Sequence, residues 1–238
     1  MTDTTLTQPH IEIPAWVMSA LSVFVIVALP VLLVLINARL LMTDAYLNFA
    51  YNSGIVPPDQ YRYPPLSREE SAPLALAYLF NDEDIDFLGD QTFSTGEPLY
   101  NERELSHMVD VKVVTQGLVR FGFILLGLTI LAGTTIAFGD PKQLLIALRS
   151  GSFLTAGLIA SGLFAVGTSF NWLFTQFHNL FFEEGTWLFL LSDTLIRLFP
   201  IEFWALAFGL MFGFALIEAA VIGGLSWWGL RHATMQPE

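Results

Sequence analysis

Four long stretches of apolar residues constrain the fold of this 238-residue chain more than any other feature. They run over about 15–37, 117–138, 153–173 and 203–228 and are nearly free of charge. A helix needs about 20 apolar residues to cross the hydrocarbon core of a bilayer. Each stretch reaches that length, so the sequence predicts an all-α membrane protein with four transmembrane helices.

The composition agrees with a membrane protein and narrows the function. Hydrophobic residues make up 54% of the chain, which is too many for an ordinary soluble domain. The net charge of −12 argues against nucleic acid as a partner. The chain has no cysteine, which excludes a thiolate nucleophile and a cysteine-ligated metal. The first stretch is longer than the apolar region of a signal peptide, so we expect a retained helix.

Four spans would place both termini on one side and the segments 38–116 and 174–202 on the other. Lys142, Arg149 and Arg231 lie on the side of the termini, which the positive-inside rule makes cytoplasmic. The acidic segment 38–116 is too long to be a bare connection. The sequence therefore predicts one multi-pass domain in the cell (cytoplasmic) membrane, with a compact extracytoplasmic cap formed mainly by the first loop.

Local signals predict the elements of this cap. Residues 38–52 have the pattern of a helix, and the capping-box spacing of Ser67 and Glu70 opens a second helix that ends near Phe80. Glycines within 85–99 favour a small hairpin. The apolar stretch 187–199 is expected to lie along the membrane interface.

Two histidines flank the second and third stretches. Asn101 and Glu104 form another capping-box pattern, which predicts one continuous helix over about 102–138. His107 then lies about 15 Å outside the apolar part of that helix. His178 follows the third stretch by a few residues. Because a short connection joins the two spans, we expect antiparallel neighbours whose outer ends bring the rings within about 10 Å on the extracytoplasmic face.

The neighbours of the histidines suggest acid–base chemistry. Glu104, His107 and Asp110 share one face of the predicted helix, where a carboxylate would fix the tautomer of the imidazole and raise its basicity. Phenylalanines surround His178 and would favour its neutral form. One more basic and one more neutral histidine suit proton transfer. Glu218, in the cytoplasmic half of the fourth stretch, is expected to pair within the bundle or to snorkel.

Two other interpretations stay open at this point. The chain could be a metal-dependent membrane hydrolase in which Glu104, His107, Asp110 and His178 supply the ligands. Against it, the Glu-x-x-His unit occurs only once, where a di-iron bundle needs two. A non-enzymatic sensor or assembly factor could instead bind a partner through its acidic cap. Sensitivity to chelators would favour the hydrolase, and function without the histidines would favour the sensor.

The segments around the histidines resemble the lipoprotein intramolecular transacylase (Lit) family of bacterial membrane proteins. The similarity lies in Glu102-Arg-Glu-Leu-Ser-His-Met-Val-Asp-Val-Lys112 and in Phe177-His-Asn-Leu-Phe-Phe182. It continues through Trp187, Asp193, Leu195-Ile-Arg-Leu-Phe-Pro200 and Glu202-Phe-Trp204. Residues 188–193 depart from a Leu-Asp-Pro-like stretch of that family.

The resemblance implies an activity and its residues. Members of the family move the sn-2 ester acyl chain of a diacylglyceryl-modified lipoprotein cysteine onto the cysteine α-amino group, which gives a lyso-form lipoprotein. The family's two essential histidines fall on His107 and His178, and we expect Glu104, Asp110 and Asn179 to support them. A neutral imidazole can deprotonate an α-amine of pKa near 8. The partners implied are the lipoprotein N-terminus and membrane lipid, with no cofactor or metal.

Overall fold

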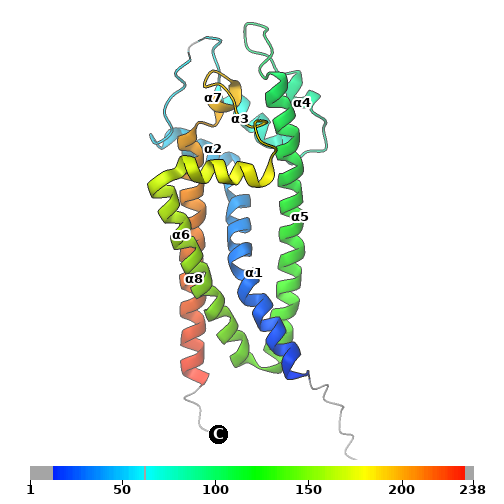
Figure 1. Cartoon of the computed structure of the whole chain (residues 1–238), viewed down its shortest axis with the longest axis vertical. Helices are drawn as coiled ribbons and strands as arrows, with labels where there is room; N and C mark the ends of the chain where they lie inside the picture. Colours follow the sequence, from blue (N-terminus) through cyan, green and yellow to red (C-terminus); the bar gives the residue numbers. More distant parts are fainter. Residues whose placement is uncertain (1–12, 62, 234–238) are drawn as a thin grey trace, which may run out of the picture.

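Four long helices form the body of the computed structural model, which describes residues 13–61 and 63–233 (Figure 1). These helices are α1 (Ala15–Leu41), α5 (Glu102–Gly139), α6 (Pro141–Phe181) and α8 (Ile201–Ala233). Each is long and apolar enough to span a membrane. The start of α1 and the end of α8 lie at the same end of the bundle (Figure 1). The predicted all-α architecture with four spans is therefore confirmed.

The order of packing differs from the prediction that the second and third spans are neighbours. Helix α1 lies between α5 and α6 (Figure 1). A Cβ added to Gly151 of α6 would come within 3.3 Å of the backbone of Ile26 in α1, and one added to Gly223 of α8 would meet Ser152 of α6 at 3.1 Å. These close approaches tie α6 to α1 and α8. The outer ends of α5 and α6 are therefore not side by side as extended helices.

The charge in the fourth span is paired inside the bundle. Asn37 of α1 is 1% exposed and donates a hydrogen bond to the Glu218 carboxylate of α8 at 2.7 Å. The same amide also donates to the carbonyl of Leu33 at 2.8 Å. The predicted pairing of Glu218 within the bundle is confirmed. Its partner lies four residues before the end of α1 at the cap.

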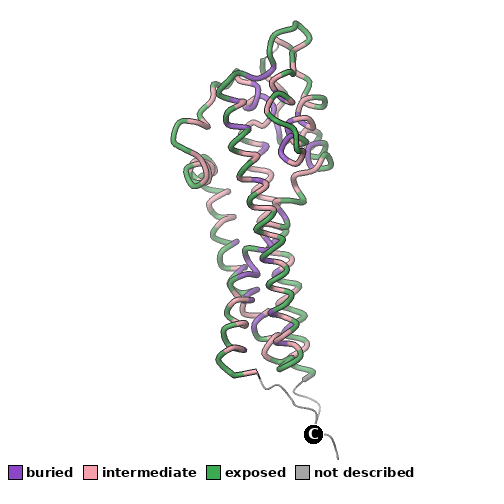
Figure 2. Tube along the Cα trace, turned by 90° about the vertical axis from the view of Figure 1, so that its right-hand side faces the viewer, coloured by how far each residue is buried: buried purple, intermediate pink, exposed green. Residues whose placement is uncertain are grey.

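Four short helices build the cap over one end of the bundle: α2 (Asp44–Asn52), α3 (Arg68–Tyr78), α4 (Asp86–Gly89) and α7 (Thr194–Leu198). Buried residues gather in the cap and along the interior of the bundle (Figure 2). The expectation that 187–199 lies along the interface is wrong for its last part, because Leu195 and Leu198 of α7 are buried in the core of the cap.

Two other predictions for the cap need correction. The helix predicted over 38–52 is interrupted, because α1 ends at Leu41 and Thr43 caps a new helix by accepting a hydrogen bond from the N–H of Tyr46. The hairpin predicted over 85–99 is reduced to the helix α4 and one isolated bridge between Thr92 and Pro98. The residues of that segment pack onto the cap core rather than pair as strands.

Candidate active site

The first turn of α5 positions His107. The side chain of Asn101 accepts hydrogen bonds from the N–H groups of Arg103 and Glu104, and the Glu104 carboxylate accepts one from the N–H of Asn101 at 2.9 Å. The predicted capping box is thus present. His107 follows one turn later and is 7% exposed. It precedes the apolar stretch that begins at Gly117 by ten residues, so it lies outside the spanning part of α5.

A break in α6 brings His178 to the same place. Ser169 has φ −158° and ψ 67°, which interrupts the helix. Beyond the break, residues 170–181, here called the arm, run across the bundle toward α5 instead of continuing outward (Figure 1). Gly167, Thr168 and Ser169 are poor helix formers in succession, and kinks are common at such positions. The arm replaces the predicted side-by-side arrangement of two extended helices.

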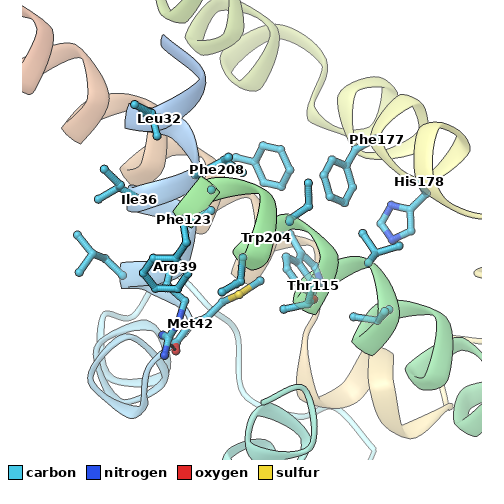
Figure 3. A pocket seen from close by; sticks show the side chains of 18 of the residues that line it. Leu32, Ile36, Arg39, Met42, Thr115, Phe123, Phe177, His178, Trp204 and Phe208 are labelled. Atoms are coloured by element: carbon cyan, nitrogen blue, oxygen red, sulfur yellow. Dashed lines mark hydrogen bonds between the residues drawn. The ribbon is translucent and has the colours of Figure 1, made fainter. Parts of the chain in front are cut away.

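The two imidazoles face each other. Their ring centroids are 6.1 Å apart and the ring planes are inclined by 24°. The prediction that the rings lie within about 10 Å of each other is confirmed. In Figure 3 the side chains of Phe177 and His178 extend from the arm toward α5.

Aromatic rings enclose His107 and change its acid–base behaviour. The ring centroids of Phe182 and Phe189 lie 4.9 Å and 5.4 Å from that of His107. Burial lowers the pKa of His107 to about 4, and the neighbouring His178 acts in the same direction. Desolvation disfavours the imidazolium because the surrounding rings offer it no counter-charge. His107 is therefore neutral at pH 7.

His178 has a similar environment. The rings of Phe174 and Trp187 pack against it, with centroid distances of 4.1 Å and 4.8 Å. Burial lowers the pKa of His178, and the hydrogen bond to the carbonyl of Phe174 acts in the opposite direction. Burial thus favours the neutral form of both histidines. The expectation that His107 would be the more basic of the two is wrong.

Glu104 does not raise the basicity of His107, because its carboxylate accepts hydrogen bonds from backbone N–H groups instead of bonding to the imidazole. One oxygen accepts from the N–H of Asn101 and the other from the N–H of Leu195 at 2.7 Å. Burial raises the pKa of Glu104, and these backbone donors act in the opposite direction. The residue is 1% exposed and joins α5 to α7. Its carboxylate thus fixes the start of the helix that carries His107 and bonds to backbone groups, not to the imidazole.

The other expected supporting residues lie outside the enclosed site. Asp110 and Asn179 are both exposed. Within the described part of the chain, no three His, Cys, Asp or Glu side chains come together in a group that could hold a metal ion. The ligand set of the metal-hydrolase interpretation is therefore not assembled by this fold.

The hydrogen bonds distinguish the two histidines. A carbonyl oxygen only accepts, so the Nδ1 of His178, 2.8 Å from the oxygen of Phe174, carries the proton and Nε2 keeps its lone pair. The Nδ1 of His107 is buried and has no hydrogen-bond partner among the residues that the structure describes. Orphaned buried N–H groups are rare, which favours the tautomer of His107 with its proton on Nε2.

Both rings line a cavity of about 320 Å³ between α1, α5, the arm and α8. Apart from the histidines, Arg39 and Thr115, its side chains are apolar, as Figure 3 shows. On α5 the lining runs from His107 to Leu126, and on α1 it runs from Leu32 to Leu40, with Met42 just beyond the helix. The cavity is therefore an apolar groove that begins at the histidines and continues into the membrane-spanning region.

Sequence reasoning missed the wall that α1 supplies and the rings of Trp187 and Phe189. The aromatic residues could be read from the sequence, but only the arm and the loop after it place them on the histidines. No sequence pattern indicated that α1 would form a wall of the cavity, because its lining residues are apolar like those of any lipid-facing helix.

These features define an integral membrane protein with two neutral histidines at the mouth of an apolar groove. The model of the lipoprotein intramolecular transacylase Lit family matches residues 16–204, and the chain belongs to this family of membrane acyltransferases.

The fold is similar to solved structures of the membrane integral lipoprotein intramolecular transacylase Lit from Bacillus cereus. One matches with a TM-score of 0.79 at 17% identity and covers 94% of this chain and 100% of that one. A variant of that protein with a histidine replaced by arginine matches with a TM-score of 0.69 at 16% identity, over 92% and 94% of the two chains. A protein of Aquifex aeolicus, described as uncharacterized, is 23% identical over 85% of this chain and 94% of its own length.

Proposed function

We propose that this protein transfers an acyl chain within a diacylglyceryl-modified lipoprotein, from the sn-2 ester to the α-amino group of the N-terminal cysteine. The observation that carries the proposal is the pair of neutral imidazoles, 6.1 Å apart, at the mouth of an apolar groove. An acyl transfer from ester to amine needs one base, one donor for the oxyanion and a place for the chain. The family membership agrees with this activity.

His178 is the base in this proposal. The α-ammonium group of the substrate has a pKa of about 8 and loses one proton to solvent as it enters the site, which leaves a neutral amine. The amine nitrogen then attacks the ester carbonyl carbon, and Nε2 of His178 accepts the proton that this nitrogen loses as the new C–N bond forms. The hydrogen bond between Nδ1 of His178 and the carbonyl of Phe174 keeps the lone pair of Nε2 available.

His107 stabilises the negative charge that develops on the carbonyl oxygen. Its Nε2–H is the free donor of the tautomer that the buried Nδ1 favours. When the tetrahedral intermediate collapses, the bond between the carbonyl carbon and the glycerol oxygen breaks. The leaving alkoxide takes the proton from His178, so an amide and a free hydroxyl form and both histidines return to the neutral state.

The groove accounts for the lipid half of the substrate. The lining residues 118–126 of α5 lie inside the apolar stretch and cover about 14 Å along the helix axis. This is close to half of the hydrocarbon thickness of about 30 Å. The groove thus has the depth of one leaflet, which suits an acyl chain whose ester lies at the surface beside the histidines.

The charges support an extracytoplasmic location for the site. Lys142, Arg149 and Arg231 lie at the end of the bundle opposite the acidic cap. A cysteine-free chain allows a direct test with a membrane-impermeant maleimide. In intact cells we expect labelling of Asp82→Cys in the cap and no labelling of Lys142→Cys. Labelling of Lys142→Cys but not of Asp82→Cys would show that the cap lies on the cytoplasmic side.

Mass spectrometry of a diacylglyceryl reporter lipopeptide tests the chemistry. We expect His178→Ala and His178→Gln to lower the rate of N-acylation equally, by about 10² to 10⁴, because neither supplies a base. His107→Ala should lower it by about 10² to 10³. His107→Gln should retain part of the rate, since its amide N–H can replace the Nε2–H donor.

Matched controls separate this proposal from its rivals. His232→Ala changes an exposed histidine at the far end of the bundle and should have no effect. Full N-acylation by the His107 or His178 variants would overturn the histidine mechanism. Release of free fatty acid without N-acylation, abolished by a chelator, would instead indicate a metal-dependent hydrolase.

A further inference from the structure

A second cavity lies between α6 and α8, at the end of the bundle opposite the histidines. Its volume is about 410 Å³. Helix α6 lines it from Arg149 to Ala156, and helix α8 lines it from Leu216 to Trp227. Most of the lining is apolar, and Gly224 leaves open space where a side chain would stand. The cavity is therefore a hollow on the bundle that an apolar chain can fill.

Arg149 is the charged residue of this cavity. It is half-buried, and it makes no ion pair or hydrogen bond with any residue in the described ranges. It lies eight residues, or about 12 Å, along α6 from the first residue of that helix. An arginine this close to the apolar region of a membrane extends toward the interface or pairs with an anionic group.

The protein itself supplies no such partner on these two helices. Helix α6 contains no Asp or Glu. Helix α8 contains Glu202, which lies at the cap end, and Glu218, which accepts a hydrogen bond from Asn37. The α6 and α8 helices of a second copy docked on this face would therefore bring another arginine and no free carboxylate. The phosphate of a lipid is the anion that the membrane offers at this depth.

Trp227 lies at the end of the cavity that is nearest the C-terminus of α8. Trp227 lines the cavity, and the guanidinium carbon of Arg231 lies 3.7 Å from the centroid of its ring. Tryptophan is enriched at the level of lipid headgroups, where its ring is apolar on one side and polar at the edge. Trp227 thus marks the end of the cavity at which a headgroup would lie.

We propose that this cavity binds an anionic phospholipid of the leaflet opposite the histidine site, with its phosphate at Arg149 and an acyl chain against Gly224. The site is separate from the acyl groove and does not depend on the transacylase activity. Its occupant joins α6 to α8 and so stabilises the pair of helices from which the arm extends.

Native mass spectrometry of the full-length protein tests the proposal. The protein is released from nanodiscs that contain phosphatidylglycerol or phosphatidylcholine, and the retained lipids are counted. We expect one phosphatidylglycerol to stay bound and phosphatidylcholine to be lost. Arg149→Gln should weaken retention by about fivefold or more, as expected for the loss of one basic residue near the headgroups. Gly224→Leu should abolish retention by filling the cavity.

Two matched variants control for charge and for volume. Lys142→Gln removes an exposed cation at the same end, and Gly127→Leu adds a side chain in open space on α5. Both should retain the lipid. Equal retention by Arg149→Gln and Gly224→Leu, or equal retention of phosphatidylcholine, would overturn the proposal. A dimer in the wild type that Gly224→Leu dissociates would overturn it as well, by identifying the face as a protein interface.

Discussion

Helices α5 and α6 each carry one histidine of the site, but they hold it in different ways. Helix α5 runs straight from the membrane. One oxygen of Glu104 joins the start of α5 to α7 by accepting a hydrogen bond from the N–H of Leu195, and the other accepts from the N–H of the cap residue Asn101. Helix α6 breaks at Ser169, and its arm carries His178 between aromatic rings. A straight helix fixes the height of its histidine above the membrane, whereas a broken helix lets the second histidine reach across to it.

The largest effect should come from rotating the arm. One Ala inserted between Trp172 and Leu173 turns the following residues by about 100°, so that His178 no longer faces α5. We expect N-acylation of the reporter lipopeptide to fall by about 10² or more, because a displaced catalytic group loses its alignment. The same insertion after Asp82, in an exposed turn of the cap, should leave the rate unchanged. Unchanged activity with the first insertion would contradict the role given to the arm.

The anchor of α5 should show its effect in stability. Glu104→Ala leaves the buried N–H of Leu195 without a partner and removes half of the capping box. We expect the free energy of unfolding to fall by about 3 kcal/mol, the sum of one unsatisfied donor and one lost cap. Thermal unfolding in detergent measures it. Glu102→Ala changes an exposed residue of the same turn and should change the Tm little. An equal decrease in Tm for both variants would show that Glu104 has no special role in anchoring α5.

The lowered pKa values make stability depend on pH. His107 has a folded pKa of about 4, below its unfolded value of about 6.5. Its neutral form is favoured in the folded state, so its contribution is present above pH 6.5 and is lost as the pH falls toward 4. The Tm of the wild type should decline over that window. The decline should be shallower in His107→Gln, and identical slopes would show that His107 is not responsible.

The smallest effect should come from the ring that packs against His178. Trp187→Phe keeps an aromatic ring but leaves a gap, so we expect a reduction in N-acylation of only a few-fold. Trp187→Ala removes the ring and should also admit water and raise the pKa of His178 toward 6.5. Titration of the imidazole by NMR in the two variants separates this positioning role from a general loss of stability, which would leave the pKa unchanged.

The α5 side of this comparison could be predicted from sequence and the α6 side could not. The Asn101 and Glu104 pattern predicted a helix over 102–138, and the structure has Glu102–Gly139. Capping is local, so a few residues suffice to recognise it. The break at Ser169 had only the weak signal of Gly167-Thr-Ser169 inside an otherwise helical pattern. The direction of the arm after the break depends on packing against other helices, which cannot be inferred from the local sequence.

The contacts of Glu104 and Asp110 could not be predicted from the local sequence either. Spacing on a helix places Glu104, His107 and Asp110 on neighbouring positions, but it does not say which partner each side chain meets. In the folded chain Glu104 meets Leu195, which lies 91 residues away in sequence. Asp110 lies in solvent. Topology predicted that His107 and His178 lie on one side of the membrane, but it is the unpredicted arm that brings their rings to 6.1 Å.

The depth of the acyl groove has a consequence for the biology of its substrate. A cavity that reaches only about halfway through the bilayer takes chains from the nearer leaflet alone. Under the proposed function, a lipoprotein whose lipid anchor lies in the opposite leaflet would not be a substrate. N-acylation would therefore be restricted to lipoproteins whose anchor lies in the leaflet next to the histidines.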